Sequence, residues 1–161
     1  AIIRKGRPYS PVSWNEFSWV SGIQAVTQKL KEAGFLLFCI TNQPDVGRGL
    51  QDRSMIESFH QYILRELPLE KIYTCYDYSN NNPLRKPKPG MIFEIRNKYD
   101  LNLDDCWVIG DRWKDIDAGN AAGCHTIFLD YGYDEALKSL PNYVISDLRQ
   151  LVPLVVKPIQ Q

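Results

Sequence analysis

The chain has 161 residues, a length typical of one ordinary domain with a substantial apolar core. Its 19 Lys and Arg balance 19 Asp and Glu, and no basic stripe favours nucleic acid or a membrane surface as a partner. We find neither a signal peptide pattern nor an apolar run of membrane-spanning length. Four widely spaced cysteines without a Cys-x-x-Cys pair are typical of free thiols in a reducing compartment. We therefore expect a cytoplasmic monomer with a small-molecule partner.

The first 19 residues are broken by Gly6, Pro8 and Pro11 and predict an irregular loop that covers another part of the domain. After them, short apolar runs predict strands, and apolar positions at helical spacing predict helices. The expected strands are 35–40, 71–76, 105–110, 125–129 and 143–145, and the expected helices are 22–33, 52–67, 89–99, 116–122 and 147–151.

This alternation of strand and helix predicts an α/β fold, a doubly wound parallel sheet with helices on both faces and no separate cap domain. We expect residues 1–161 to form one domain. Polar candidates follow directly after predicted strands. Because the carboxyl ends of parallel strands meet at one edge of a sheet, we expect these side chains to converge there.

The segment from Trp107 to Gly119 contains two of these candidates. Asp111 follows the buried strand, and Asp115 lies four residues later, where a helix would turn it back toward Asp111. Two carboxylates at such a distance favour a cation beside them, and Mg²⁺ fits because it takes one or two carboxylates and keeps positions for water and phosphate. The alternative is a turn residue followed by an acid that complements the helix dipole.

A second cluster runs from Arg85 to Met91, where Pro87 and Pro89 stiffen the backbone around neighbouring cations. A fixed cation next to a carboxylate-bound Mg²⁺ is suited to a phosphoryl group, whose transfer depends on positioning and on neutralised charge. Thr41, Lys86 and Asp111 together supply a hydroxyl, a cation and a metal ligand.

Three segments resemble motifs II, III and IV of the haloacid dehalogenase superfamily and occur in the same order along the chain. They are Ile40-Thr41-Asn42-Gln43, the Arg85–Met91 cluster and Gly110–Asp115. Asn42-Gln43 with Gly47-Arg48-Gly49 is similar to the branch with heptose bisphosphate phosphatases, histidinol phosphatases and the phosphatase domain of polynucleotide kinase-phosphatases. The resemblance covers nearly the whole chain.

The resemblance implies roles for individual side chains. Thr41 would hydrogen-bond the transferred phosphoryl group, Lys86 would neutralise it, and Asp111 would bind Mg²⁺. Asp115 would support the metal and Lys86. The positions implied to contact substrate are Asn42, Gln43, Arg85 and Arg112. The alternative for Arg85 and for Lys88 is a solvated charge in a loop.

Two departures from the family pattern stand out. Motif I, an Asp-x-Asp-Gly that supplies the aspartyl nucleophile at the end of the first strand, is absent, since no aspartate precedes Asp45, and we expect the domain to lack this first strand, which the resemblance places at the centre of the sheet. We therefore expect either a nucleophile encoded upstream of Ala1 or a relative that no longer catalyses. The family's cysteine and histidine set is also reduced to Cys75 in the 75–84 loop, which predicts no structural zinc.

We expect a Mg²⁺-dependent phosphomonoester hydrolase that acts through an aspartyl-phosphate intermediate on a small metabolite. The expected substrate is a sugar phosphate such as heptose 1,7-bisphosphate, or histidinol phosphate. The alternatives are a catalytically silent phosphate-binding or scaffolding relative, and a polynucleotide 3′-phosphatase. The neutral charge and the lack of a kinase phosphate-binding loop disfavour the last. Tyr9, Trp14 and Trp113 are expected near the mouth of an open site.

Overall fold

The computed structural model describes residues 2–4 and 6–156, and its strands form three small sheets. The strands are β1 (Ile2–Arg4), β2 (Arg7–Tyr9), β3 (Phe38–Asn42), β4 (Lys71–Cys75), β5 (Trp107–Gly110), β6 (His125–Leu129) and β7 (Tyr143–Ile145). β3 pairs with β4, and β6 pairs with both β5 and β7, and all these pairings are parallel. β1 and β2 form an antiparallel hairpin.

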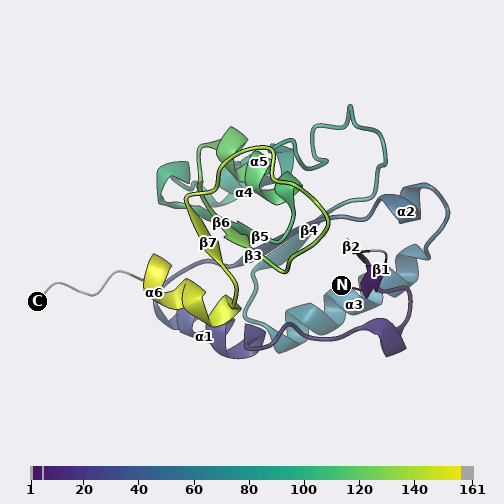
Figure 1. Ribbon diagram of the computed structural model, residues 1–161, viewed down its shortest axis with the longest axis horizontal. Coiled ribbons are helices and arrows are strands. Elements are labelled where there is room, and N and C mark those ends of the chain that lie inside the picture. Colours follow the sequence, from purple (N-terminus) through teal and green to yellow (C-terminus); the bar gives the residue numbers. More distant parts are fainter. Residues whose placement is uncertain (1, 5, 157–161) are drawn as a thin grey trace, which may run out of the picture.

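Helices cover both faces of the parallel strands. The helices are α1 (Ile23–Glu32), α2 (Pro44–Gly47), α3 (Arg53–Glu66), α4 (Gly90–Tyr99), α5 (Trp113–Ala122) and α6 (Leu151–Val155), with 3₁₀ turns η1 (Trp14–Glu16), η2 (Leu103–Asp105) and η3 (Leu148–Gln150). Figure 1 shows α4 and α5 on one side of the strands and α1, α3 and α6 on the other. This arrangement confirms the expected α/β layers. Among the described residues, no helix combines the length and apolarity needed to cross a membrane.

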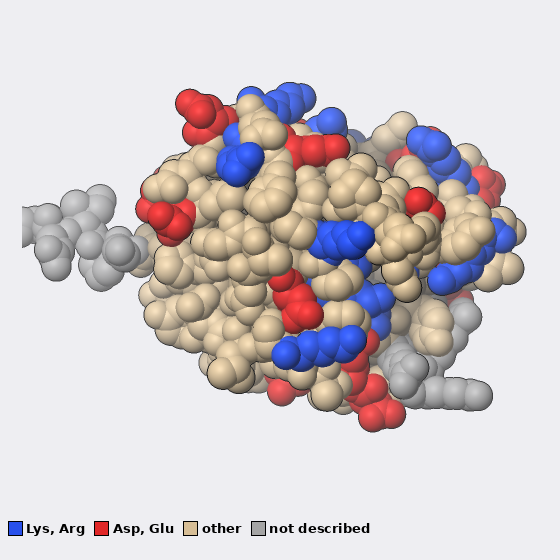
Figure 2. All heavy atoms as spheres, turned by 90° about the horizontal axis from the view of Figure 1, so that it is seen from above, with Lys and Arg blue, Asp and Glu red and all other residues tan. Residues whose placement is uncertain are grey.

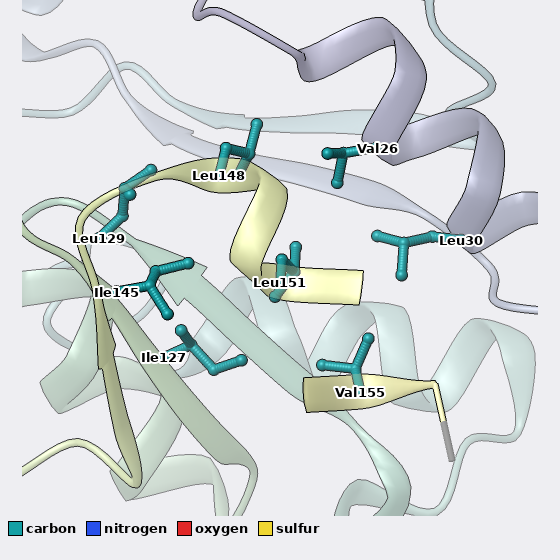
Figure 3. Packing of buried hydrophobic residues seen from close by; sticks show 8 residues of the cluster. All are labelled: Val26, Leu30, Ile127, Leu129, Ile145, Leu148, Leu151 and Val155. Atoms are coloured by element: carbon teal, nitrogen blue, oxygen red, sulfur yellow. The ribbon is translucent and has the colours of Figure 1, made fainter. Parts of the chain in front are cut away.

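The largest apolar cluster joins α1, η3 and α6 to β6 and β7. Figure 3 shows its buried side chains pointing toward one another from these elements. Ile127 in β6 is fully buried and lies within this cluster. An aliphatic side chain buried to this degree contributes about 1.5–3 kcal/mol. The cluster consists of Val26, Leu30, Ile127, Leu129, Ile145, Leu148, Leu151 and Val155.

On the opposite face, α5 lies close against β5 and β6. Gly119 permits this approach, because a Cβ atom there would come within 2.6 Å of Thr126 and 2.9 Å of Val108. The hydroxyl of the fully buried Thr126 donates to Asn120 Oδ1 (3.0 Å). The packing of α5 on β5 fixes the turn between them, and this turn carries Asp111.

The parallel strands are divided into two sheets at the junction of β3 and β5, and the sequence predicted that a central strand would be missing from this domain. Within the described residues, β3 pairs only with β4, and β5 pairs only with β6, so each strand has one edge without a strand partner. The two sheets still share apolar contacts: Ile40 and Val108 pack against one cluster, and Leu37 and Ile109 against another. The parallel halves are thus packed together but not hydrogen-bonded as one sheet.

Several element boundaries differ from those predicted. The N-terminal segment contains the β1–β2 hairpin instead of being irregular throughout. β3 spans Phe38–Asn42 and not residues 35–40, so it ends two residues later than predicted and includes Thr41 and Asn42. α5 begins at Trp113, not at residue 116, so Asp115 lies in its first turn. The short helix α2 was not predicted. The expected domain also includes residues 1, 5 and 157–161, which lie outside the described residues.

Candidate active site

Lys86 connects the two parallel sheets through its ammonium group. Its Nζ atom donates to the carbonyl oxygen of Ile40 in β3 (2.8 Å) and to Oδ1 of Asp115 in α5 (2.6 Å). The Lys86 and Asp115 side chains are only 12% and 10% exposed, so solvent screens their attraction weakly. Asn42 fixes the Lys86 backbone: its Oδ1 accepts from the Lys86 amide (3.1 Å), and its Nδ2 donates to the Lys86 carbonyl oxygen (2.9 Å). The ammonium is thereby held between β3 and α5.

Gln43, directly after β3, links the Thr41 hydroxyl to the N-terminal segment. Its Nε2 donates to Thr41 Oγ1 (3.2 Å), and its Oε1 accepts from Ser10 Oγ (2.9 Å). Two residues before Ser10, the Pro8 carbonyl oxygen accepts from Arg112 Nη1 (3.5 Å). Residues 8–10 therefore contact both halves of the site, the end of β3 and the turn after β5.

Asp111 is the first residue after β5. Its Oδ2 accepts a hydrogen bond from the hydroxyl of Tyr133 (2.9 Å), in the loop after β6. Burial raises the pKa of Asp111, the Tyr133 hydrogen bond opposes this shift, and the nearby charge of Asp115 raises the pKa further. Burial and the Asp111 charge likewise raise the pKa of Tyr133. A carboxylate in such surroundings is stabilised when a cation binds it.

Asp115 lies in the first turn of α5, where the sequence predicted that it would turn toward Asp111. Gly110 makes this close approach possible, because a Cβ atom there would overlap the Asp115 side chain. Oδ2 of Asp115 accepts from the Arg112 amide (3.1 Å), and Oδ1 accepts from Lys86. The cation that neighbours Asp115 in the structure is therefore the Lys86 ammonium.

Arg112 forms a bidentate ion pair with Glu135, in the loop after β6. Its Nε donates to Glu135 Oε2 (2.6 Å), and its Nη2 donates to Oε1 (2.5 Å). This hydrogen bonding lowers the pKa of Glu135 and raises that of Arg112. Two parallel bonds fix both the position and the plane of the guanidinium group.

Arg85 and Lys88 have different surroundings. Arg85 is buried and its Nη1 donates to the Asp77 carbonyl oxygen (3.2 Å), so the alternative of a solvated loop charge is wrong for Arg85. Lys88 is exposed, and its Nζ donates to the Asn81 carbonyl oxygen (2.9 Å). The Asp77 carboxylate accepts from the Asn82 side chain (3.0 Å), and hydrogen bonding within this loop lowers the pKa of Asp77.

The structure brings most of the predicted site residues into direct contact and adds two that the sequence did not identify. Tyr133 and Glu135 belong to no motif, although they follow β6 at the sheet edge where functional side chains collect. Trp14, which was expected near the mouth, is half-exposed and packs edge-on against Phe59 (4.7 Å between ring centroids). The predicted residues linked through hydrogen bonds are Thr41 with Gln43, Asn42 with Lys86, Lys86 with Asp115, and Asp115 with Arg112.

Comparison with known proteins identifies relatives among sugar phosphatases. A D-glycero-beta-D-manno-heptose-1,7-bisphosphate 7-phosphatase of Pseudomonas aeruginosa is 32% identical over 119 residues, which cover 70% of this chain and 66% of that protein. A D-glycero-alpha-D-manno-heptose-1,7-bisphosphate 7-phosphatase of Campylobacter jejuni is 30% identical over 119 residues, which cover 71% of this chain and 69% of the relative. The chain thus spans about two thirds of the length of these relatives.

A family model and a solved structure agree with these relatives. The model described as HAD-hydrolase-like matches residues 83–151, which include Lys86, Asp111 and Asp115. The crystal structure of a D,D-heptose 1,7-bisphosphate phosphatase from B. bronchiseptica, complexed with magnesium and phosphate, superposes with a TM-score of 0.72 at 24% identity and covers 88% of this chain and 87% of that one. The chain belongs to the haloacid dehalogenase-like phosphatases, in the branch of the heptose-1,7-bisphosphate phosphatases.

Proposed function

We propose that this protein is a Mg²⁺-dependent phosphomonoester hydrolase whose substrate is a small sugar phosphate, foremost a heptose 1,7-bisphosphate, with histidinol phosphate as a second candidate. The names of the relatives support the substrate class. The observation that carries the proposal is the partly buried Lys86 ammonium, held between the Ile40 carbonyl oxygen and Asp115. A cation fixed in this way is in place before a phosphoryl group arrives, so the protein need not reorganise to neutralise charge.

Some residues of the chain contact the phosphoryl group, and others position them. The Thr41 hydroxyl, oriented by Gln43, donates a hydrogen bond to a phosphoryl oxygen. Lys86 neutralises a second oxygen, and Asp115 and Asn42 keep Lys86 in position. Bound Mg²⁺ would supply further charge neutralisation and orient the phosphate.

Asp111 is the residue that would hold the metal. Within the described part of the chain, no group of three or more His, Cys, Asp or Glu side chains is placed to hold an ion. A site with one protein carboxylate still suits Mg²⁺, which keeps several waters and binds substrate phosphate. Structural zinc needs four ligands, and the 75–84 loop offers one thiol, Cys75. We therefore propose that purified protein holds no stoichiometric zinc, which metal analysis can test. In the structure, the Asp77–Asn82 hydrogen bond connects the two parts of this loop.

The nucleophile is the remaining requirement. We propose that an Asp-x-Asp segment outside these 161 residues lies as a strand between β3 and β5. Among the described residues, β3 and β5 each have one edge without a strand partner, which supports this placement, as does Lys86, whose ammonium bonds to Ile40 in β3 and to Asp115 in α5. A central strand there would join the two parallel halves into one sheet and place a carboxylate at its carboxyl end.

Two alternatives to this function are a polynucleotide 3′-phosphatase and a catalytically silent phosphate-binding relative. Figure 2 shows Lys and Arg interspersed with Asp and Glu on the face seen from above, without a continuous basic stripe, which argues against a polynucleotide substrate. A silent phosphate-binding relative would retain the Lys86 site without turnover. We propose that the protein acts as a cytoplasmic monomer. Its four free cysteines support the cytoplasmic part of this proposal, because thiols stay reduced in that compartment.

The direct test measures phosphate release from heptose 1,7-bisphosphate, histidinol phosphate and a 3′-phosphorylated oligonucleotide by the full-length gene product, with Mg²⁺ and with EDTA. We expect Mg²⁺-dependent release that is fastest with the heptose bisphosphate. Preference for the oligonucleotide would support the 3′-phosphatase. Phosphate binding without release from any of the three would support the silent relative.

A further inference from the structure

Arg85 is a buried cation without a carboxylate partner. The residue is 7% exposed, and among the residues that the structure describes it forms no ion pair. Its guanidinium group donates from Nη1 to the backbone carbonyl oxygen of Asp77 (3.2 Å). Its charge lowers the pKa of Lys114, so the group lies near the start of α5 and the turn that carries Asp111. A buried guanidinium held by a neutral carbonyl oxygen remains available to an anion that enters the site.

The side chains of Asp77 and Asn82 join the two parts of the 75–84 loop. Oδ1 of Asp77 accepts from the Ser79 amide (2.8 Å), and its Oδ2 accepts from Asn82 Nδ2 (3.0 Å). Oδ1 of Asn82 accepts from the Leu84 amide (2.8 Å). Hydrogen bonds from Ser79 and Asn82 lower the pKa of Asp77, so its carboxylate is ionised at neutral pH and can only accept. The pair therefore has one direction, with Asn82 as donor and Asp77 as acceptor.

This pair holds Arg85 at two points. The Asp77 carbonyl oxygen accepts from the guanidinium group, and the Asn82 carbonyl oxygen accepts from the Arg85 amide (3.2 Å). A shift of Asp77 relative to Asn82 would therefore move the guanidinium group relative to its own backbone. The loop contains one thiol, Cys75, which is too few for a structural metal site, so hydrogen bonds are the means by which this chain can hold the loop.

We propose that Asp77 and Asn82 are positioning residues for Arg85 and that, through Arg85, they set how tightly the protein binds its phosphorylated substrate. This inference rests on the proposed phosphatase function, in which Arg85 makes the substrate contact that the family resemblance implies. A guanidinium group that is held in place before the ligand arrives loses less conformational freedom on binding. Loss of the Asp77–Asn82 bond should therefore weaken substrate binding more than it slows the chemical step.

The pair can be tested by exchanging its two members. In Asp77→Asn, the new amide group faces the amide group of Asn82, and turning either amide would break the bond to Ser79 or to Leu84. In Asn82→Asp, two carboxylates face each other. The double variant Asp77→Asn/Asn82→Asp exchanges donor and acceptor, keeps the net charge and restores all three bonds.

The matched control lies in a second aspartate–asparagine pair. Asp105 Oδ2 accepts from Asn102 Nδ2 (2.9 Å), and Asp105 precedes β5, whereas the site lies after this strand. Asp105→Asn therefore breaks the same kind of bond far from Arg85. A second comparison introduces Asp77→Asn into an Arg85→Ala background, which measures whether the two residues act through each other.

The measurements use the full-length gene product with heptose 1,7-bisphosphate and Mg²⁺. KM and kcat are determined for wild type and each variant. Hydrogen exchange of residues 79–85 reports the order of the loop without turnover, and unfolding temperatures verify that each variant is folded.

We expect Asp77→Asn to raise KM about threefold to tenfold, the effect typical of one hydrogen bond, with a smaller change in kcat and faster hydrogen exchange in the loop. The double variant should return KM and hydrogen exchange to wild-type values, and Asp105→Asn should match wild type in both. In the Arg85→Ala background, Asp77→Asn should cause no further rise in KM, because the guanidinium group that it positions is gone.

An unchanged KM in Asp77→Asn, or an equal rise in KM with and without Arg85, would overturn the positioning role and leave the phosphatase proposal in place. A double variant that restores the order of the loop but not KM would also overturn it. If wild type releases no phosphate from this substrate, the proposed function is wrong and the positioning role is wrong with it, even where hydrogen exchange shows that the pair orders the loop.

Discussion

The β3–β4 half and the β5–β6–β7 half of the molecule hold the site in different ways. At the end of β3, the contacts that hold Lys86 involve the backbone: Asn42 bonds to both the amide and the carbonyl of Lys86, and Lys86 bonds to the Ile40 carbonyl oxygen. In the β5–β7 half, side chains bond to side chains, as Tyr133 does to Asp111. The first half holds a cation, Lys86, through backbone contacts, and the second holds a carboxylate, Asp111, through a side-chain contact.

This difference suggests a division of tasks. Contacts to backbone atoms hold a group in one position. A constant position suits Lys86, which we propose contacts the phosphoryl oxygen of every substrate. Contacts between side chains can change with a single substitution, which suits the part of a site that distinguishes substrates. Lys86 and Asp115 connect the halves, so variants at this connection should affect both stability and activity.

The largest effect is expected in the β5–β7 half. Asp111→Asn removes the charge of the proposed metal ligand without changing its volume, and we expect phosphatase activity of the full-length gene product to fall by about two orders of magnitude or more with the fold intact. Steady-state rates across a Mg²⁺ titration measure this. The control Asp134→Asn also removes one negative charge, from an exposed residue near the site, and should hydrolyse substrate at the wild-type rate. An unchanged rate and Mg²⁺ dependence in Asp111→Asn would show that Asp111 is not the ligand.

In the β3–β4 half, Lys86→Ala should reduce kcat about a hundredfold, because the cation beside the phosphoryl group is lost. Lys88→Ala is the matched control two residues away, since Lys88 is exposed and, among the residues that the structure describes, its ammonium bonds only to a loop carbonyl oxygen. Turnover assays compare the two variants. Impaired Lys88→Ala together with a normal rate in Lys86→Ala would reassign the role to Lys88.

Asp115→Asn tests the connection between the halves through stability. The substitution leaves the Lys86 ammonium buried without its carboxylate, and losing one partner of a buried pair costs about 3 kcal/mol. Urea unfolding should show this decrease in the free energy of unfolding. Asp104→Asn, at an exposed aspartate in η2, should stay close to wild type. Equal stability of the two variants would show that the pair does not hold the halves together.

The smallest effect concerns Glu135, whose pKa the Arg112 hydrogen bonds hold below its ordinary value of 4.5. A carboxyl group with a lowered folded pKa stabilises the fold above its unfolded pKa and loses that contribution as the pH falls through the folded pKa. Glu135→Gln should therefore reduce the free energy of unfolding by about 1 kcal/mol at neutral pH, since the pair is partly exposed. The difference from wild type should shrink below pH 4.5. A difference that is constant down to pH 3 would contradict the ion pair.

The sequence predicted the two halves with different success. β6 and β7 have the predicted bounds, because compact apolar runs end there at polar residues. The start of β3 was wrong, since Phe35 and Leu37 continue the apolar run but pack against the cluster of α1 and β6 without strand pairing. Motif residues such as Lys86 could be found from local spacing. Glu135 could not, because its role depends on Arg112, 23 residues earlier, and no short pattern records that contact.

The central claim is that Thr41, Lys86 and Asp111 hold a phosphoryl group for a nucleophile on a strand between β3 and β5. The most direct measurement compares Mg²⁺-dependent phosphate release from heptose 1,7-bisphosphate by the 161-residue chain and by a chain extended at its N-terminus through a Leu-Asp-x-Asp-Gly segment. We predict no measurable turnover by the shorter chain, and turnover with a higher unfolding temperature for the longer one, because the added strand supplies the nucleophile and pairs both free edges. Equal rates of hydrolysis by the two chains would contradict this account.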